Sequence, residues 1–416
     1  MTTPDEKDNQ SYQISLPLDE SQHLQKLRET EKQKRLLVIL VSIVGFLVVA
    51  CLIGIGIAAA QWSRLNAHPQ VLWRHKVGGT IASAPFISNG VVYFGTLGDS
   101  PAFFAVDRAT GQELWRTPTS DLVFDWVSTV ANGMVFLTTD DGYFLALDAD
   151  TGKEQWQFGP EQRQENLPDD PECLWCALKF RPPTIANGII YVASHDDYIY
   201  ALDASSGTEK WRFDTGSLVW GAPIIEDGLL YAGCNNGRIY ILDAKTGIEQ
   251  QQFNFLGDIN SIKVEGNMLY IATELDLIAK NRHTGVEQWH KITSIMDGFS
   301  RQLHMDDERL YLLSMSRMTA IDKSTGSFDW KSNKFHGSVF SEPAIAEGVV
   351  VVGDADSYLY VLDAGTGKLI RRYNMVLHDP TSKMSYGAEF IFDPIVVDNV
   401  VYFGWYDYLY AMQMPE

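Results

Sequence analysis

The chain has 416 residues, 45% of them hydrophobic, and a formal net charge of −20. Residues 1–35 hold seven acidic and six basic side chains, so a charge of −19 falls on the remainder. Because phosphate binding needs clustered Lys and Arg, this balance argues against nucleic acid as a partner. The four cysteines are too few for a disulfide-framework protein.

The N-terminal part is predicted to be a polar cytoplasmic tail (1–35), a transmembrane helix (36–60) and a linker (61–70). Residues 36–60 are 25 positions without a charge, enough for a helix of roughly 37 Å. Five basic residues lie shortly before this stretch, whereas Arg64 is the one basic residue shortly after it. This bias predicts a cytoplasmic N-terminus and an extracytoplasmic remainder, attached to the membrane through one helix. The basic residues are Lys26, Arg28, Lys32, Lys34 and Arg35.

Two other interpretations of the apolar segment stay open. Residues 48–51, Val-Val-Ala-Cys, loosely resemble a bacterial lipobox, which would make Cys51 a lipidated residue. The apolar run continues for nine residues beyond Cys51, where a mature lipoprotein normally becomes polar. A cleaved signal peptide would have a much shorter leader than 35 residues. We therefore favour an uncleaved span.

A repeat fills the rest of the chain. Its core is Asp-x-x-Thr-Gly, as in ALDADTGKEQW (146–156), and the seven copies end 41, 55, 40, 38, 41 and 41 residues apart. A period near 40 with strand-like content is typical of propeller blades. Short β-branched and aromatic runs between Asx-Gly turns predict four antiparallel strands in each blade. The copies end at Trp115, Trp156, Trp211, Gln251, Trp289, Trp330 and Arg371.

The quoted copy indicates what each repeat residue does. Leu147 is expected in the core between blades, Asp148 is expected to accept backbone N–H groups across the turn, and Gly152 supplies a positive φ. Trp156 begins the outer strand and is wide enough to reach the next blade. These residues are therefore predicted to be structural.

The two ends of the chain are predicted to share one blade. The last unit, 400–416, lacks an outer strand, and VLWRHKV (71–77) resembles an outer strand without a blade of its own. If this strand completes the last unit, the fold is all-β, an eight-bladed propeller over residues 71–416, and Trp73 joins the tryptophan series. Closure also removes exposed sheet edges.

Two connections, 157–180 and 373–390, are longer than the others. Both join an outer strand to the next inner strand, so they are expected on one face of the ring. Long loops often carry function, and we expect an envelope protein partner to bind this face.

These units resemble the PQQ-like, tryptophan-docking repeats. The resemblance covers residues 71 to about 412 and implies one of two functions. BamB-type propellers are non-enzymatic scaffolds in outer-membrane β-barrel assembly, whereas quinoprotein dehydrogenases bind pyrroloquinoline quinone and calcium. This chain has no Cys-Cys pair of the kind that alcohol-oxidising quinoproteins carry, and several of its connections are short. The resemblance therefore favours a scaffold without a cofactor or catalytic residue, with a quinoprotein oxidoreductase as the alternative.

The alternative has candidate residues at the ends of the inner strands, which are expected to point towards the axial channel. Carboxylate, amide and arginine groups beside an aromatic wall could hold a charged planar ligand and a hard cation. Glu342 or Glu389 could then act as a general base. Polar groups around a wet channel are also common for structural reasons, and no metal site is assigned. The candidate ligand-binding residues are Asp125, Trp126, Arg181, Trp220, Asn260, Arg301, Glu342 and Glu389.

Cys173 and Cys176 form the one cysteine pattern, CxxC. No His follows Cys176, which excludes covalent haem attachment there. The acidic loop around the pair opposes a reactive thiolate, so a local disulfide is the favoured interpretation.

Overall fold

The structure is a computed structural model of the chain. It describes residues 28–34, 50–53, the single positions 36, 40, 44 and 46, and most of 70–414. Within 70–414 the description omits 82, 99, 120–128, 140–141, 160–179, 220, 274, 293–298, 315, 340 and 379–390. The chain divides into two compact units, Met1–Arg64 and Leu65–Glu416.

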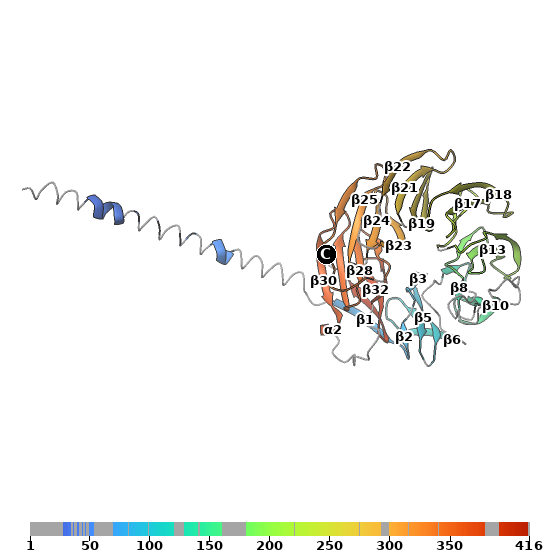
Figure 1. Cartoon of the computed structure of the whole chain (residues 1–416). Coiled ribbons are helices and arrows are strands. Elements are labelled where there is room, and N and C mark those ends of the chain that lie inside the picture. The colour runs from blue at the N-terminus through green and yellow to red at the C-terminus, as the bar shows by residue number, and fades with distance from the viewer. Residues whose placement is uncertain are drawn as a thin grey trace, which may run out of the picture. The chain divides into compact units, whose positions relative to one another are not determined.

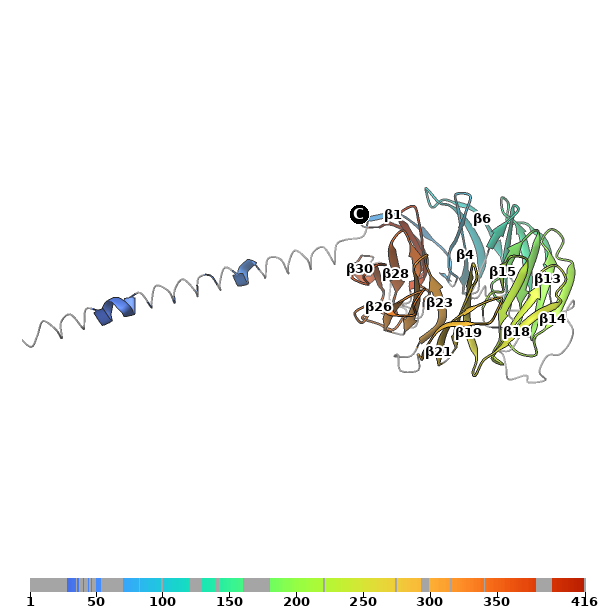
Figure 2. The same cartoon turned by 90° about the horizontal axis from the view of Figure 1, so that it is seen from above.

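The second unit is an eight-bladed β-propeller, which confirms the predicted fold class (Figures 1 and 2). Each blade is an antiparallel sheet whose strands follow one another in sequence, except in the eighth. The first blade contains β2 (Thr80–Ile81), β3 (Phe86–Ser88), β4 (Val91–Leu97), β5 (Ala102–Asp107) and β6 (Glu113–Pro118), and the second contains β7 (Thr129–Ala131), β8 (Met134–Thr138), β9 (Phe144–Asp148) and β10 (Glu154–Phe158). The third blade contains β11 (Thr184–Ala186), β12 (Ile189–Ala193), β13 (Tyr198–Asp203) and β14 (Glu209–Asp214). The fourth blade contains β15 (Ile224–Glu226), β16 (Leu229–Gly233), β17 (Arg238–Asp243) and β18 (Glu249–Asn254).

The last four blades follow the same plan. The fifth blade contains β19 (Ile259–Glu265), β20 (Met268–Thr273), β21 (Asp276–Asn281) and β22 (Glu287–Ile292), and the sixth contains β23 (Phe299–Met305), β24 (Arg309–Ser314), β25 (Arg317–Asp322) and β26 (Phe328–Lys331). The seventh blade contains β27 (Ala344–Ala346), β28 (Val349–Gly353), β29 (Tyr358–Asp363) and β30 (Leu369–Asn374), and it is followed by α2 (Met375–His378). The eighth blade contains β31 (Ile391–Val397), β32 (Val400–Trp405), β33 (Tyr408–Gln413) and β1 (Gln70–Lys76).

The eighth sheet is built from both ends of the propeller sequence. β1 pairs antiparallel with β33, from Gln70 opposite Gln413 to Lys76 opposite Tyr408. In Figure 1 the blue strand β1 accordingly lies against the red strands at the end of the chain. The ring is therefore closed by a strand that precedes the first blade.

The repeat turn joins the third and outer strands, and its aspartate caps it. Asp148 Oδ1 accepts hydrogen bonds from the Thr151 amide (2.9 Å) and hydroxyl (2.7 Å), while Gly152 has a φ of 69°. The outer-strand tryptophan of each blade then docks on the turn of the next. The indole N–H groups of Trp73, Trp115, Trp156, Trp211, Trp289 and Trp330 donate to the carbonyls of Arg108, Ala149, Ala204, Ala244, Lys323 and Ala364 at 2.9–3.2 Å.

Two junctions differ. Gln251 replaces the tryptophan of the fourth blade, and the ring of Phe253 lies against Gly285 of the fifth blade instead. Arg371 replaces the tryptophan of the seventh blade, and its receiving blade has no turn between β33 and β1.

The core is divided among the junctions between blades. Eight clusters of buried apolar side chains occupy the described junctions, each with members from two neighbouring blades. Phe136 and Phe144 of the second blade, for example, pack with Ile190 and Val192 of the third. Burial on both faces of each sheet is the main stabilising term for such a ring.

The strand order gives the ring two distinct ends. We call the end with the turns between first and second and between third and outer strands the turn face. The opposite end, where outer strands connect to the next inner strand, is the loop face. The connections from β10 to β11 and from β30 to β31 lie on the loop face. Most of both long connections is outside the described residues.

In the first unit, residues 28–34 and 50–53 are helical. Within the described residues, no helix combines the length and apolar character needed to cross a membrane. Most of the predicted span, 36–60, is not among those residues.

Candidate functional site

Three of the predicted axial residues have described side chains, namely Arg181, Asn260 and Glu342. Each lies where an inner strand begins, at the loop-face end of the channel. Arg301 has a described backbone in β23 but no described side chain. The others lie outside the described residues: Asp125, Trp126, Trp220 and Glu389.

Irregular strand starts position this group. The register of β19 shifts between Ile259 and Ser261, so Asn260 is the extra residue of a bulge. The register of β31 shifts between Phe392 and Ile395, at Asp393. Bulges re-aim side chains, and here they occur in the inner strands of the fifth and eighth blades.

Arg181 is anchored by its backbone. Its N–H donates to the Ala193 carbonyl at 2.7 Å, next to the β-bridge between Phe180 and Ser194. The residue is 3% exposed, and burial lowers the pKa of its guanidinium to about 10. The group therefore stays charged at neutral pH, and it contributes a buried cation to the loop-face end of the third blade.

Glu342 connects the seventh and eighth blades. Its backbone N–H donates to Asp393 Oδ1 at 2.6 Å. Asp393 lies four residues after Glu389, the predicted residue of the eighth blade, which is outside the described residues.

Sequence reasoning missed two further axial residues, Lys263 and His304. They occupy one register position in the inner strands of adjacent blades, opposite Tyr270 and Tyr311 respectively. Aligning the inner strands by that tyrosine would have identified them, since the equivalent positions elsewhere are apolar or carry a hydroxyl. Those positions are Phe86, Thr129, Thr184, Ile224, Ala344 and Ile395.

Burial sets the charge of this pair. Desolvation, with a contribution from the Lys263 charge, lowers the pKa of His304 to about 3, so the imidazole is neutral at physiological pH. Desolvation also lowers the pKa of Lys263, and the Glu342 carboxylate opposes that shift. The charges of Lys263 in the fifth blade and Glu342 in the seventh thus stabilise each other.

The described axial groups could bind a small anion through Lys263 or Arg181. Calcium needs several oxygen ligands. No group of three or more His, Cys, Asp or Glu in the described part of the chain is placed to hold a metal ion.

The loop face exposes apolar side chains on the fourth and fifth blades. Leu256 is 88% exposed, Leu275 is 50% exposed and Ile292 is 66% exposed. Asp276 and Ile292 are strand partners, which places Leu275 beside Ile292. Such clusters of exposed apolar groups are typical of protein-binding surfaces.

The predicted disulfide is outside the described residues, since both Cys173 and Cys176 lie in 160–179. Of the described cysteines, Cys51 is exposed and Cys234 is buried, and both are free. Burial raises the pKa of the Cys234 thiol to about 12, so it is not a reactive thiolate.

Comparison with known families shows where this propeller belongs. The family described as outer membrane protein assembly factor BamB matches residues 63–172, 164–294 and 273–404. These overlapping ranges include strands of all eight blades.

Individual relatives are similar along most of this chain, at a low sequence identity. Outer membrane protein assembly factor BamB of Shewanella oneidensis is 22% identical over 376 residues, covering 80% of this chain and 86% of that protein. The crystal structure of BamB from Moraxella catarrhalis, 20% identical, covers 84% of this chain and 99% of its own, with a TM-score of 0.63. Quinohemoprotein alcohol dehydrogenase of Comamonas testosteroni is 23% identical over 365 residues, covering 78% of this chain but 46% of the enzyme. The structural likeness is evidence of a shared fold alone.

Proposed function

Since the chain belongs to the family of the outer membrane protein assembly factor BamB, we propose that it is a protein-binding scaffold of the cell envelope. The proposed protein is single-pass and membrane-anchored, with its N-terminus in the cytoplasm and its propeller outside. The family match across all eight blades carries the proposal. The apolar segment at 36–60 and the basic residues before it support the anchor and its orientation.

We place the main partner surface on the loop face. Both long connections leave from this face, and Leu256, Leu275 and Ile292 are exposed there. An aliphatic side chain that is half or more exposed gains free energy when a partner covers it. A scaffold needs such a surface but no catalytic group or cofactor, and we propose none.

Photo-cross-linking tests the surface in cells. A photoreactive amino acid at Leu256 or Leu275 of the full chain is expected to form an adduct with an envelope protein, and Ile292→Asp should reduce its yield several-fold. The matched control is Ile248, which is 62% exposed at the start of an outer strand, on the turn-face side. Equal adducts from Ile248, or none from the loop face, would contradict this placement.

The second candidate is a quinoprotein oxidoreductase, which the relationship to the quinohemoprotein alcohol dehydrogenase supports. Titration of the full chain with pyrroloquinoline quinone and calcium, followed by tryptophan fluorescence and calorimetry, separates the two. The scaffold proposal expects no saturable binding up to about millimolar ligand, where the free energy is only about −4 kcal/mol. Saturable one-to-one binding would support the enzyme and make Arg181 and Glu342 the first residues to substitute.

A further inference from the structure

Each outer strand of the propeller contains a bulge at the same place. In all eight blades the register shifts immediately before the tryptophan position, so one extra residue is left out of the strand pairing. From the first blade to the eighth, these bulge residues are Leu114, Gln155, Lys210, Gln250, Gln288, Asp329, Ile370 and Leu72.

The bulges divide the ring into a polar and an apolar part. The bulge residue is polar in the second to sixth blades and aliphatic in the seventh, eighth and first, which are consecutive around the closed ring. The residue before it is glutamate in the first to fifth blades and apolar in the sixth, seventh and eighth. We call the apolar members of these two positions the apolar rim. They are Val71, Leu72, Leu114, Phe328, Leu369 and Ile370.

Most of the apolar rim is open to solvent. Four of its side chains are 40–57% exposed, and the other two, Leu369 and Ile370, are partly buried. Arg74 and Arg116 are exposed as well, each two residues after a leucine of the rim. Aliphatic groups beside arginines suit the boundary of a lipid bilayer, where the apolar side chains reach the acyl region and the guanidinium groups meet phosphates.

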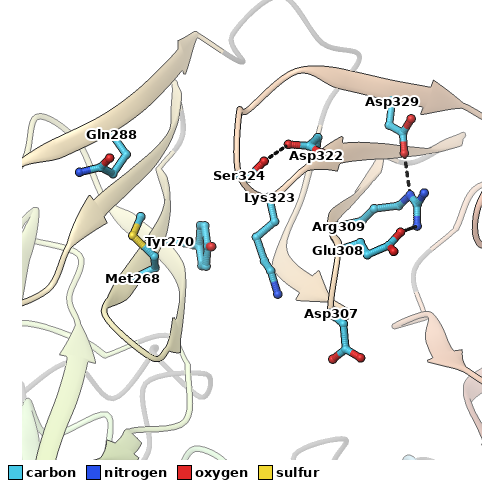
Figure 3. A pocket seen from close by; sticks show the side chains of 10 residues that line it. All are labelled: Met268, Tyr270, Gln288, Asp307, Glu308, Arg309, Asp322, Lys323, Ser324 and Asp329. Carbon is cyan, nitrogen blue, oxygen red and sulfur yellow. Dashed lines mark hydrogen bonds and ion pairs between the residues drawn. The ribbon is translucent and has the colours of Figure 1, made fainter.

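The bulge residues of the fifth and sixth blades have a different setting. Gln288 and Asp329 lie on opposite walls of a turn-face cleft of about 610 Å³, which Asp307 and Asp322 also line (Figure 3). Asp329 Oδ2 accepts a hydrogen bond from Arg309 Nε at 2.6 Å. Carboxylates would lose hydration at a bilayer and would be repelled by lipid phosphates, so this part of the ring is unsuited to a membrane surface.

The chain enters the propeller within the apolar sector. The outer strand of the eighth blade, β1, begins at Gln70, opposite Gln413 at the turn-face end of β33. The predicted span ends at residue 60, and the chain from 60 to 70 can extend over at most about 35 Å. The start of β1 is therefore held close to the bilayer. A short tether raises the effective concentration of lipid at the rim, so weak contacts are sufficient for binding.

We propose that the apolar rim binds the outer surface of the membrane in which the chain is anchored. The inference rests on the anchor of the proposed function and adds an orientation to it. The rim residues lie at the turn-face end of their outer strands, so this contact leaves the loop face accessible to a protein partner. The glutamates at the equivalent positions of the second to fifth blades oppose binding through the other side of the ring.

Fluorescence quenching by lipid tests this contact. The full-length chain, with an environment-sensitive fluorescent amino acid at Leu114, is embedded in nanodiscs of phosphatidylethanolamine and phosphatidylglycerol that contain lipids brominated near the headgroup. The matched control carries the label at Ile248, which is 62% exposed just before the outer strand of the fourth blade. We expect quenching about threefold stronger at Leu114 than at Ile248.

A paired substitution tests the apolar side chains themselves. Val71→Glu with Leu72→Gln gives the eighth blade the Glu-Gln pair that the second, fourth and fifth blades have at their bulges. Because the same bulge accommodates this pair in three blades, the melting temperature should not change, whereas quenching at Leu114 should fall about threefold. The reverse exchange in the fourth blade, Glu249→Val with Gln250→Leu, should leave quenching at Leu114 unchanged.

Several results would overturn the membrane contact. They are equal quenching at Leu114 and Ile248, no quenching at Leu114, or quenching that the Glu-Gln variant leaves unchanged. A fluorescence change in detergent that depends on protein concentration would assign the rim to a second copy of the chain instead. The proposed function has a separate readout: if the chain stays in the nanodiscs and loop-face cross-links persist in cells while Leu114 is not quenched, the anchored scaffold stands and the membrane contact fails.

Discussion

Arg282 is predicted to stabilise the junction that lacks a docking tryptophan. Its side chain is 1% exposed and makes three contacts: with the Tyr231 hydroxyl at 2.7 Å, with the Gly266 carbonyl at 2.5 Å and with the Asp227 carboxylate. Tyr231 and Gly266 belong to different blades, so the arginine joins the fourth blade to the fifth. Since Gln251 stands at the tryptophan position, this arginine and Phe253 hold the junction together.

The loss of stability caused by Arg282→Ala depends on whether water can replace the arginine at each of its three partners. Asp227 is 71% exposed, and the Gly266 turn is exposed, so water can replace the arginine at both. Tyr231 is fully buried, and leaving its hydroxyl unsatisfied costs about 1–3 kcal/mol. Loss of the packed side chain adds to this, while removal of a buried cation offsets part of it. We therefore expect a net loss of about 2–3 kcal/mol.

Thermal melting and hydrogen exchange measure the effect. In a ring of this size the melting temperature should fall by about 3–4 °C. Exchange should rise in β15–β22 before it rises elsewhere, because neighbouring blades open as units. Arg108→Ala is the matched control, since Arg108 is 23% exposed in its side chain and its junction retains Trp73. A shift below about 1 °C, or a larger loss for Arg108→Ala, would refute the reasoning.

Three further predictions concern stability. Gly152→Ala should lower the free energy of unfolding, measured in urea, more than Gly133→Ala does. Both glycines have a positive φ, but a Cβ at 152 would lie 2.5 Å from the Trp115 ring, whereas one at 133 would meet nothing within 4 Å. Equal losses would contradict the docking of Trp115 on this turn. Ser324 and Thr325 hold the pKa of Asp322 at about 2, below its unfolded value of about 4, so its contribution is present above pH ~4 and lost as the pH falls to about 2. Thr325→Val should therefore flatten the decline of melting temperature in that window. His304 is neutral in the folded protein and takes up a proton on unfolding below about pH 6.5, so the free energy of unfolding falls as the pH is lowered from ~6.5 to about 3. His304→Gln should reduce this fall when melting temperatures are measured across that pH range.

The ring could be predicted from the sequence because its signals are local and repeated. Asp148, Thr151 and Gly152 form one turn within five residues, and the same spacing recurs with a period near 40. The repeated local turn predicts the strand pairing of seven blades, and the eighth follows from the incomplete last unit and the unassigned strand at 71–77. The sequence therefore predicts the eight-bladed fold that the structure has.

The axial site was harder to predict because its geometry depends on irregular strands. The regular inner strands have only three described residues, as in β11 and β27, which is too short for an alternating pattern to define their faces. Bulges at Asn260 and near Asp393 also shift the register where the channel begins. Lys263 and His304 were missed for this reason, although each stands opposite a repeat tyrosine.

The two departures from the tryptophan series have different physical reasons. A docking tryptophan needs a glycine turn beneath its ring and a carbonyl for its N–H, as Trp330 has in Gly367 and Ala364. The eighth blade offers no such turn, because its outer strand β1 is not joined to β33, and a tryptophan at Arg371 would have nothing to dock on. The fifth blade does offer one at Gly285, and there Phe253 takes the place of the missing ring. The sequence change at Gln251 is thus compensated by neighbouring side chains, whereas the change at Arg371 follows from how the ring closes.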